Sequence, residues 1–481
     1  MKIKLSNGKT LPLEMHKIKI VQPTCLPPLR RRLRAIEEAG YNTFLLRSQD
    51  VFLDMLTDSG TNAMSDNQLA AMMTADDAYA GSESFFRLAE AVREVLGFRY
   101  VLPVHQGRAA EHLIVKALVK PGDVVLMNYH FTTTKAHVDL AGGKVVEVFG
   151  DEALETASSC PFKGNLDLER FDLAVHEYGT ERIAFVRMEA TTNLIGGQPF
   201  SLENLRQVKA RAAALGIPLV FDGSLISENA YFIQQREPDL AGATLQEVLR
   251  VMMSQVDLFY MSGRKSAAAR GGLIATNDRA LYERILPWLP VYEGFSTYGG
   301  MSTKEIEAMA VGLREMVDPA VASSGADFVE HFVARLEEAG VPVVTPAGGL
   351  ACHVDARRFL LHVPQSAYPA GALAAAFYIA SGVRGMERGT LSTDPDPSGA
   401  DVLADMELLR LAVPRRTYTL SHIEYAVDRL AWLFAHRELI GGLRFVEQPP
   451  VLRFFFGRLA PDGDWGAELA RAFAADFGED C

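Results

Sequence analysis

Two stretches of the sequence place polar residues directly after a short apolar run: IPLVFDGS (217–224) and LFYMSGRKS (258–266). Both runs are continuously apolar rather than alternating, which is typical of parallel strands buried on both faces. In a doubly wound α/β sheet, ligands bind at the carboxyl ends of such strands. We therefore expect Asp222 and Lys265, which follow the two runs, to point into the same crevice.

The chain between about residues 90 and 275 repeats this pattern. Helical segments such as 109–119 and 202–215 separate the apolar runs, and Gly216 and Pro218 end the second of them. This alternation predicts a mostly parallel sheet with helices on both faces. The expected strands are 100–104, 124–128, 145–149, 183–188, 217–221, 258–261 and 273–275.

A second, smaller α/β domain is expected after the small polar stretch VASSGAD (321–327). Its first elements are predicted to be a helix over 328–339, a strand over 341–344 and a turn at 346–349. The predicted division of the chain is 1–56 for an N-terminal arm and part of the small domain, 57–318 for the large domain, 319–459 for the small domain and 460–481 for an acidic tail, either a short amphipathic helix or frayed.

The composition argues against several classes of protein. The chain has 481 residues and a formal net charge of −12, whereas nucleic-acid binding needs clustered basic residues. The longest apolar stretch, near 371–380, is too short to span a bilayer. Four scattered cysteines without CxxC spacing, and an N-terminus without an apolar signal segment, predict a cytoplasmic protein.

The strand-end residues match the needs of one cofactor, pyridoxal phosphate (PLP). PLP requires a lysine amine that forms a Schiff base and a carboxylate that keeps its pyridine nitrogen protonated, and Lys265 and Asp222 are such a pair. HQGR (105–108), at a predicted strand-to-helix turn, offers backbone N–H groups to the phosphate. Ser262 adds a hydroxyl, and Phe131 is placed to stack on the pyridine ring.

Longer motifs identify a family. They are LTDSGTNAMSD (56–66), DDAYAGS (76–82), HQGRAAE (105–111), NLIGGQP (193–199), SENAYF (227–232), MSGRKS (261–266), STYGG (296–300), MERG (386–389) and VPRRTYT (413–419). In this order the sequence resembles the β-eliminating lyases, the family of tryptophanase and tyrosine phenol-lyase, and is more similar to the tyrosine phenol-lyase branch. The resemblance extends from about Phe44 to Leu459.

The resemblance implies a fold, a reaction and an assembly. The fold would be the PLP-dependent aminotransferase-like fold, also called fold type I. The reaction would be the β-elimination of tyrosine, or of a substituted tyrosine, to a phenol, pyruvate and ammonia. The active site would form at a dimer interface within a homodimer or homotetramer.

The resemblance also implies roles for the residues around the cofactor. Lys265 would carry PLP and remove the Cα proton of the substrate, and Tyr79 would protonate the leaving ring carbon. Asp222 would pair with the pyridinium, and Asn193 would donate a hydrogen bond to the O3′ atom of the cofactor. The other cofactor-binding residues implied are Gln106, Gly107, Arg108, Phe131, Ser262 and Arg264.

A further set of implied residues would bind the substrate. Arg410 would take its carboxylate in a bidentate pair, a geometry that guanidinium supplies well. Arg388 would face the phenol oxygen together with the Thr132 hydroxyl, stabilising charge that develops there. The remaining implied residues are Thr57, Ser59, Phe44, Met386 and Phe454 for the substrate, and Gly60 and Asp77 for a monovalent cation such as K⁺.

Several residues depart from the family pattern near the expected cofactor. Leu225 stands in place of an arginine, Arg264 in place of a lysine and Ser266 in place of an aspartate. Asp77 stands in place of a glutamate, and Phe295 in place of a methionine. These departures leave open a PLP enzyme of the same fold that acts on tryptophan or a modified amino acid by β-elimination, β-replacement or transamination. A PLP-binding regulatory protein is the non-enzyme alternative, and the intact set of Tyr79, Lys265, Arg388 and Arg410 argues against it.

Overall fold

The computed structural model describes residues 1–396, 398–449 and 451–479. The chain divides into two compact units. Unit 1 comprises Met1, Ser59–Ala153 and Cys160–Ala326, and unit 2 comprises Lys2–Asp58, Leu154–Ser159 and Asp327–Cys481.

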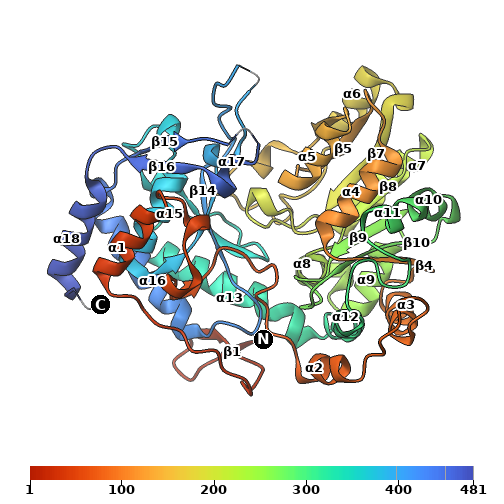
Figure 1. Ribbon diagram of the computed structural model, residues 1–481, viewed down its shortest axis with the longest axis horizontal. Helices are drawn as coiled ribbons and strands as arrows, with labels where there is room; N and C mark the ends of the chain where they lie inside the picture. The colour runs from red at the N-terminus through yellow and green to blue at the C-terminus, as the bar shows by residue number, and fades with distance from the viewer. Residues whose placement is uncertain (397, 450, 480–481) are drawn as a thin grey trace. The chain divides into compact units, whose positions relative to one another are not determined.

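Unit 1 is built on a seven-stranded sheet, within the residues that the structure describes (Figure 1). Its strands are β4 (Tyr100–Val104), β5 (Val124–Met127), β6 (Lys144–Glu147), β7 (Ile183–Glu189), β8 (Leu219–Asp222), β9 (Leu258–Ser262) and β10 (Gly272–Thr276). The strand order is β4-β10-β9-β8-β7-β5-β6, and β10 runs antiparallel to both of its neighbours while the other pairs are parallel. The predicted mostly parallel sheet is therefore confirmed.

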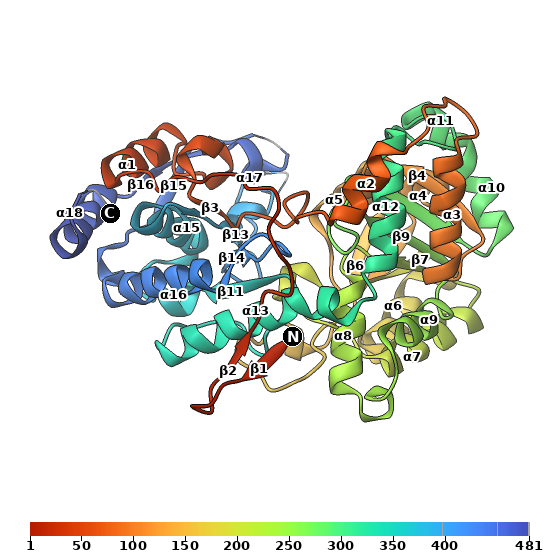
Figure 2. The same ribbon diagram turned by 90° about the horizontal axis from the view of Figure 1, so that it is seen from below.

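Helices cover both faces of this sheet. They are α2 (Asp66–Met73), α3 (Glu83–Val95), α4 (Gly107–Leu118), α5 (Thr132–Leu140), α6 (Leu168–Tyr178), α7 (Leu202–Ala214), α8 (Ile226–Arg236), α9 (Leu245–Met253), α10 (Arg279–Ile285), α11 (Leu289–Tyr292) and α12 (Thr303–Glu315). Helices α2, α3 and α12 lie side by side (Figure 2). Successive residues of a strand point to opposite faces, so Phe221 packs into the cluster of α7 and α9, whereas Val220 packs into the cluster of α4 and α5.

Unit 2 contains several small sheets. Strands β11 (Ala351–Asp355), β14 (Leu408–Ala412) and β13 (Met386–Arg388) form an antiparallel sheet in that order. The other strands pair as β1 (Lys2–Lys4) with β2 (Thr10–Pro12), β3 (Leu53–Asp54) with β12 (Val383–Arg384), and β15 (Leu443–Glu447) with β16 (Arg458–Pro461). The helices are α1 (Leu29–Glu38), α14 (Ala356–Phe359), α15 (Pro369–Ser381), α16 (Leu420–Ala435), α17 (Arg453–Phe456) and α18 (Trp465–Phe477).

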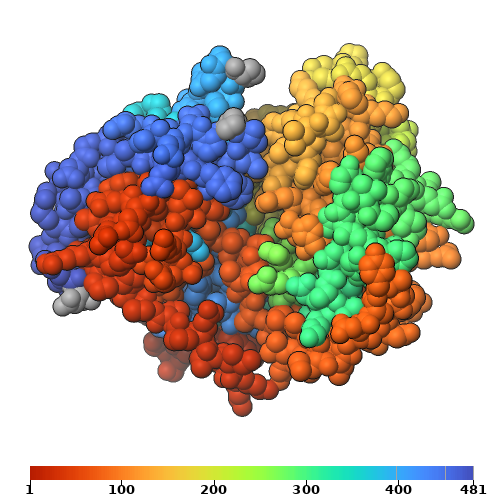
Figure 3. Space-filling model, viewed as in Figure 1, coloured from red at the N-terminus to blue at the C-terminus, as the bar shows by residue number. Residues whose placement is uncertain are grey.

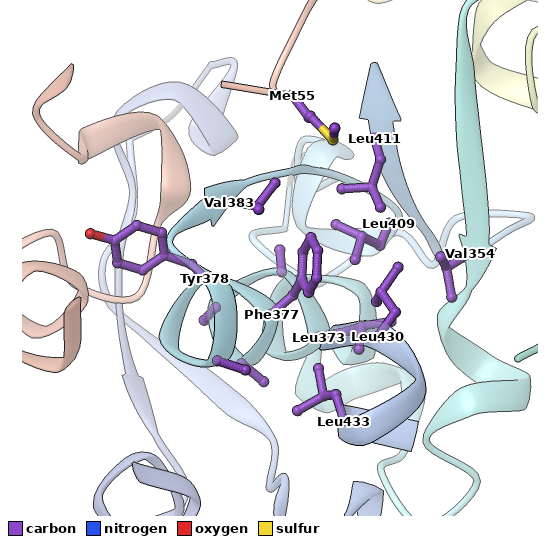
Figure 4. Packing of buried hydrophobic residues seen from close by; sticks show 14 of the residues in the cluster. Met55, Val354, Leu373, Phe377, Tyr378, Val383, Leu409, Leu411, Leu430 and Leu433 are labelled. Atoms are coloured by element: carbon purple, nitrogen blue, oxygen red, sulfur yellow. The ribbon is translucent and has the colours of Figure 1, made fainter. Parts of the chain in front are cut away.

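Helix α15 is the centre of the unit 2 core. All of its residues are buried, as expected for a helix that is apolar around its whole circumference. Its Phe377 and Leu373 lie among Leu409 of β14 and Leu430 of α16 (Figure 4). Pro369 occupies the first turn, where its missing N–H is not needed. The apolar stretch that was too short to span a bilayer is thus a core helix.

The junction after residue 318 differs from the prediction in two ways. The helix predicted over 328–339 begins earlier, because α13 (Pro319–Glu338) includes the stretch VASSGAD, where Ala322 and Ala326 are buried. Small residues at these positions suit a closely packed helix. Residues 341–344 do not form a regular strand, because Val343 makes an isolated bridge to Val354 instead of extending a sheet.

The C-terminal segment forms helix α18, which buries Leu469 and Phe473. This helix contacts α1, and the space-filling view shows the N-terminal segment in red beside the C-terminal segment in blue within unit 2 (Figure 3). Among the described residues, no helix has the length and apolar character needed to cross a membrane.

Two glutamates are buried close together in unit 2. Glu387 of β13 receives a hydrogen bond from the Ser392 hydroxyl at 2.5 Å, and Glu407 receives one from the Thr390 backbone N–H at 2.7 Å. Burial, and next the negative charge of Glu407, raise the pKa of Glu387 from 4.5 to about 8. The folded chain therefore holds a proton on Glu387 in the pH range where the unfolded chain has released it.

We predict that the Glu387→Gln substitution flattens the pH dependence of stability. The contribution of Glu387 to the wild-type free energy of unfolding is largest below about pH 4.5. It falls as pH rises toward about 8, because unfolding then releases a proton from this side chain. A shift of this size corresponds to a difference on the order of 5 kcal/mol. Urea denaturation at several pH values measures it, and the exposed Glu447→Gln variant is the matched control. An unchanged slope in Glu387→Gln contradicts the assignment.

Candidate active site

The parallel strands of unit 1 bring several predicted site residues to one edge of the sheet. Asp222 is the last residue of β8, and Lys265 follows the neighbouring strand β9 by three residues. Strands β5 and β7 run parallel to β8 and end at the same edge, where Phe131 and Asn193 follow them. The ends of neighbouring strands thus bring these predicted residues to one edge of the sheet.

Lys265 lies half-buried in the turn after β9. Its Nζ is 5.3 Å from the centroid of the Phe131 ring. The Asn62 side-chain amide donates hydrogen bonds to the backbone carbonyls of Arg264 and Lys265, at 3.1 and 3.0 Å, and so fixes the turn. The predicted Schiff-base lysine and the predicted stacking ring thus lie together.

Asp222 is buried and its two carboxylate oxygens have different partners. Its Oδ2 accepts hydrogen bonds from Arg187 Nη2 at 2.6 Å and from the Tyr260 hydroxyl at 3.0 Å, and its Oδ1 accepts one from the Ser224 backbone N–H at 3.0 Å. Burial alone raises the pKa of Asp222, but the cationic Arg187 and Lys265 outweigh it and hold the pKa below its ordinary value. Asp222 is therefore a carboxylate at neutral pH.

The start of α4 approaches the end of β9 very closely. A Cβ atom on Gly107 would lie 2.8 Å from Cβ of Ser262 and 3.0 Å from its backbone nitrogen. A glycine is therefore required at this position. Gln106 precedes the helix without capping it through its side chain, and Arg108 is exposed beside it. The first turn of α4 thus presents backbone N–H groups and the positive end of a helix dipole to an anion.

Arg264, which departs from the family pattern, lies next to Gly60. Its Nη1 is 3.7 Å from the position that a Cβ atom on Gly60 would occupy, and the Gly60 N–H donates to the Arg264 carbonyl at 3.4 Å. Burial, followed by the charges of Arg270 and Arg108, lowers the pKa of Arg264. A guanidinium in this position adds positive charge to the part of unit 1 that contains Arg108.

Three other predicted residues lie in the same unit. Asn193 begins a buried 3-10 turn, and its backbone N–H donates to Glu189 Oε1 at 3.1 Å. Thr132 is the first residue of α5 and is half-buried, as is Ser59. Leu225, which replaces the family's arginine, is fully buried and its carbonyl accepts a hydrogen bond from the Thr191 hydroxyl.

Tyr79 and Asp77 lie on an exposed part of unit 1. The Tyr79 side chain is 74% exposed, and its ring lies 6.1 Å from that of Phe295 and 5.2 Å from that of Tyr298. A hydrogen bond with Tyr298 raises the pKa of Tyr79. Asp77 accepts a long hydrogen bond, 3.4 Å, from the Thr303 hydroxyl. Among the described residues, these contacts do not connect Tyr79 to Lys265.

The predicted substrate residues of unit 2 lie on neighbouring strands. Met386 of β13 pairs directly with Arg410 of β14, and Arg410 Nη2 contacts Met386 Sδ at 2.7 Å and donates to the Leu56 carbonyl at 2.8 Å, next to Thr57. Burial lowers the pKa of Arg410 to about 10. The Arg388 guanidinium is 5.9 Å from the centroid of the Phe454 ring.

The aromatic members of this set also touch. The rings of Phe44 and Phe454 meet edge to face at 5.4 Å, and Asn42 fixes this contact by donating a hydrogen bond to the Phe454 carbonyl at 2.9 Å. Phe44, Met386, Arg388, Arg410 and Phe454 are thus brought together within unit 2. A cation beside aromatic rings is a setting that suits an aromatic ligand with a polar end.

A cavity of about 560 Å³ also lies in unit 2, but it belongs to a different part of the surface. It is lined by residues that include Thr156, Asp355, Arg358 and Glu407, and the predicted site residues are not among those that line it. Its volume does not make it the active site, because it lacks the lysine and carboxylate pair that the chemistry needs.

Sequence reasoning missed a group of charged residues around Asp222. Arg187 and Glu189 belong to β7, Tyr260 to β9 and Glu111 to α4, and all four side chains are buried. The signal was present in the sequence: VRME (186–189) places an arginine inside the apolar strand predicted over 183–188 and a glutamate directly after it. Buried charges are found where they are paired, so these residues pointed to an internal polar cluster.

Comparison with known proteins places the chain in a family. The family model for beta-eliminating lyases matches residues 54–429. The chain belongs to the beta-eliminating lyase family. It is 46% identical over 450 residues to tyrosine phenol-lyase of Symbiobacterium thermophilum, covering 93% of this chain and 98% of the relative. It is 43% identical over 462 residues to tyrosine phenol-lyase of Pasteurella multocida, covering 94% and 99%.

Solved structures confirm the fold that the family resemblance implied. A serine palmitoyltransferase of Sphingomonas wittichii superposes with a TM-score of 0.54 at 14% identity, covering 80% of this chain and 88% of that one. An aminotransferase from Staphylococcus aureus superposes with a TM-score of 0.55 at 13% identity, covering 80% and 94%. At this level of identity the similarity concerns the fold, which is the aminotransferase-like α/β fold.

The donor set of unit 1 in this beta-eliminating lyase fits PLP. An amine and an ionised carboxylate stand at neighbouring strand ends, a ring lies beside the amine, and the glycine-dependent cradle between α4 and β9 offers N–H groups to a phosphate. Lys265, Asp222, Phe131, Gly107 and Ser262 would hold the cofactor.

We predict that the Gly107→Ala substitution weakens PLP binding. The added methyl group would push α4 away from Ser262 and displace the N–H groups that face the phosphate. Fluorescence titration of the apoprotein with PLP measures the dissociation constant, which we expect to rise by about tenfold or more. Gly242→Ala is the control, because a Cβ atom there meets nothing within 4 Å. Equal affinities of the two variants would contradict the cradle.

Proposed function

We propose that the chain is a PLP-dependent carbon–carbon lyase that splits tyrosine, or a substituted tyrosine, with water into a phenol, pyruvate and ammonia. The observation that supports it most strongly is the Lys265 and Asp222 pair beside Phe131, found in a chain 46% identical to a tyrosine phenol-lyase over 93% of its length. The proposal includes PLP as the cofactor that Lys265 carries.

The residues of unit 1 have distinct proposed tasks. When bound, PLP supplies an electron sink for negative charge at the α-carbon of the substrate. Asp222, held as a carboxylate, keeps the pyridine nitrogen protonated, because a carboxylate stabilises the adjacent cationic form. The Lys265 amine removes the α-proton as a general base. Asn193 supports the O3′ oxygen, since Leu225 offers neither a charge nor a donor there.

The arginines of unit 2 are proposed to recognise the two ends of the substrate. Arg410 remains protonated at neutral pH even though burial lowers its pKa to about 10, and a desolvated guanidinium binds a carboxylate strongly. Arg388, beside the Phe454 ring, stabilises the charge that builds on the phenol oxygen while the ring leaves, with Thr132 as a hydroxyl donor. Phe44, Met386, Thr57 and Ser59 complete the proposed set.

Tyr79 is proposed as the general acid that protonates the leaving ring carbon. Its exposure and its packing against Phe295 support a place at an interface between copies of the chain, in a homodimer or homotetramer. A monovalent cation such as K⁺ is proposed near Gly60 and Asp77, and the positive charge of Arg264 beside Gly60 would weaken its binding. The cysteine pattern supports a cytoplasmic location.

We predict that the purified protein releases phenol and pyruvate from tyrosine, and that Lys265→Ala abolishes both. The variant lacks the amine that carries the cofactor and removes the α-proton. Borohydride reduction followed by peptide mass spectrometry locates the covalent link to PLP, which we expect on Lys265. Lys304→Ala, which removes an exposed lysine of the same unit, is the control. Absence of pyruvate from tyrosine and from ring-substituted tyrosines would refute the proposed function, as would reductive labelling of another lysine.

We predict that Arg388→Ala impairs the cleavage of phenolic substrates but spares S-alkyl cysteines. A thiolate leaves without a cation aimed at a phenol oxygen, whereas removal of one donor that faces developing charge lowers the rate by about 10²–10³. Pyruvate release from tyrosine and from an S-alkyl cysteine gives the ratio of the two activities. Equal losses on both substrates would show that Arg388 supports the structure of unit 2 instead.

A further inference from the structure

Arg187 lies at the centre of a buried network behind the proposed cofactor site. Its side chain is completely buried, and each of its three guanidinium nitrogens contacts a partner. Nη2 donates to Asp222 Oδ2 at 2.6 Å, Nη1 to Glu189 Oε2 at 3.2 Å, and Nε to the Tyr260 hydroxyl oxygen at 2.8 Å. A guanidinium is rigid and planar, so three contacts fix its partners relative to one another.

The two carboxylate oxygens of Asp222 have different hydrogen-bond partners in this network. A carboxylate oxygen accepts about two hydrogen bonds. Oδ2 accepts two, from Arg187 and Tyr260, whereas Oδ1 accepts the Ser224 N–H, and the Ser224 hydroxyl also interacts with this carboxylate. Arg187 and Tyr260 therefore engage Oδ2 and leave Oδ1 as the oxygen that a protonated pyridine nitrogen would meet.

The same arginine reaches the other side of the site through Glu189. Glu189 Oε2 contacts Arg187, and Glu189 Oε1 accepts the backbone N–H of Asn193 at 3.1 Å. Asn193 is the residue proposed to face O3′ of the cofactor. Arg187 thus links the partner of the pyridine nitrogen on β8 to the turn that carries the partner of O3′ after β7.

We infer that Arg187 is a positioning residue, which fixes Asp222 and, through Glu189, the Asn193 turn in the arrangement that receives the cofactor ring. This inference rests on the proposed function, because it assigns Arg187 to the site that binds PLP. It adds a cationic residue on β7 to a site in which Leu225 takes the place of an arginine.

The charges that face Asp222 agree with this role. Asp222 is faced by Arg187 and Glu189 of β7, Tyr260 of β9, Glu111 of α4 and Lys265 after β9. Burial raises the pKa of both Glu189 and Glu111, and the negative charge of Asp222 raises both further. Thr133 and Thr134 donate hydroxyl hydrogen bonds to Glu111. The arrangement therefore favours the negative charge on Asp222 over the other two acids.

The test compares a charge-retaining and a charge-neutral replacement. Arg187→Lys keeps the cation but not the planar fork. The double variant Arg187→Met, Glu189→Gln removes one positive and one negative charge together, which limits the destabilisation by an unpaired buried ion. The Gln side chain retains an acceptor for the Asn193 N–H. For each protein we measure the PLP dissociation constant between about pH 6 and pH 9, together with kcat and KM.

The double variant is expected to bind PLP weakly at acidic pH. Without Arg187 the pKa of Asp222 rises, so its carboxylate is lost as pH falls, whereas the wild-type carboxylate persists. We expect the variant-to-wild-type ratio of dissociation constants to grow by about tenfold from the alkaline to the acidic end of the range. Arg187→Lys is expected to restore the wild-type pH profile while kcat stays low at nearly unchanged KM, because the fork is missing.

Arg453→Met is the matched control. Arg453 is also completely buried and pairs with an aspartate, Asp401, at 2.6 Å, but it belongs to unit 2. Its loss is expected to lower the melting temperature without changing the pH profile of PLP binding. Wild-type PLP affinity and pH profile in both Arg187 variants would overturn the inference. A wild-type protein that carries no PLP on Lys265 would instead refute the proposed function.

Discussion

The carboxylate of Asp222 lies in a part of unit 1 from which water is excluded, so its charge has to be balanced within the protein. The balance comes from Arg187, which is itself buried and would be unstable there without its acidic partners. Each ion thus permits the burial of the other. The edge of the sheet at which the strands end, the turn with Asn193 and the helix with Glu111 are all arranged around this pair.

Close backbone approach is the second requirement of the same region. The first turn of α4 lies against Ser262 at a distance that leaves no room for a side chain on Gly107. This contact brings N–H groups of one element next to the hydroxyl of another, and both then face the place where a phosphate would bind. In the proposed function, charge balance at Asp222 and steric fit at Gly107 serve opposite ends of one cofactor site.

Unit 2 also contains buried charged side chains, and among them are arginines that lie beside apolar and aromatic residues. Its arginines on β13 and β14 lie among aromatic and aliphatic side chains, and burial lowers the pKa of Arg410. A guanidinium with little solvent around it has a strong electrostatic preference for an anionic ligand. Next to Arg388 in the sequence, Glu387 keeps its proton because it is buried and because a second acid, Glu407, lies nearby; both raise its pKa. The strand thus presents its cation without a neighbouring negative charge.

The sequence by itself determined the parallel sheet, the positions of Asp222 and Lys265 at strand ends, and the family. These features are local: an apolar run of five residues specifies a buried strand, and the residue that follows it must lie at the end of that strand. The tertiary structure decided what surrounds Asp222. Arg187, Glu189, Tyr260 and Glu111 come from two strands and a helix that are distant in sequence, and their hydrogen bonds depend on strand order and side-chain direction.

The same distinction explains the errors near residue 320. The small polar stretch VASSGAD is predicted to precede a helix, yet it is itself helical, because small side chains let α13 pack closely against buried neighbours. Residues 341–344 are apolar like a strand, but whether a strand forms depends on a partner with free backbone groups, and Val343 meets Val354 in a single bridge. Local composition predicts which segments are buried, whereas the hydrogen-bond partners that turn a buried segment into a strand are supplied by distant parts of the chain.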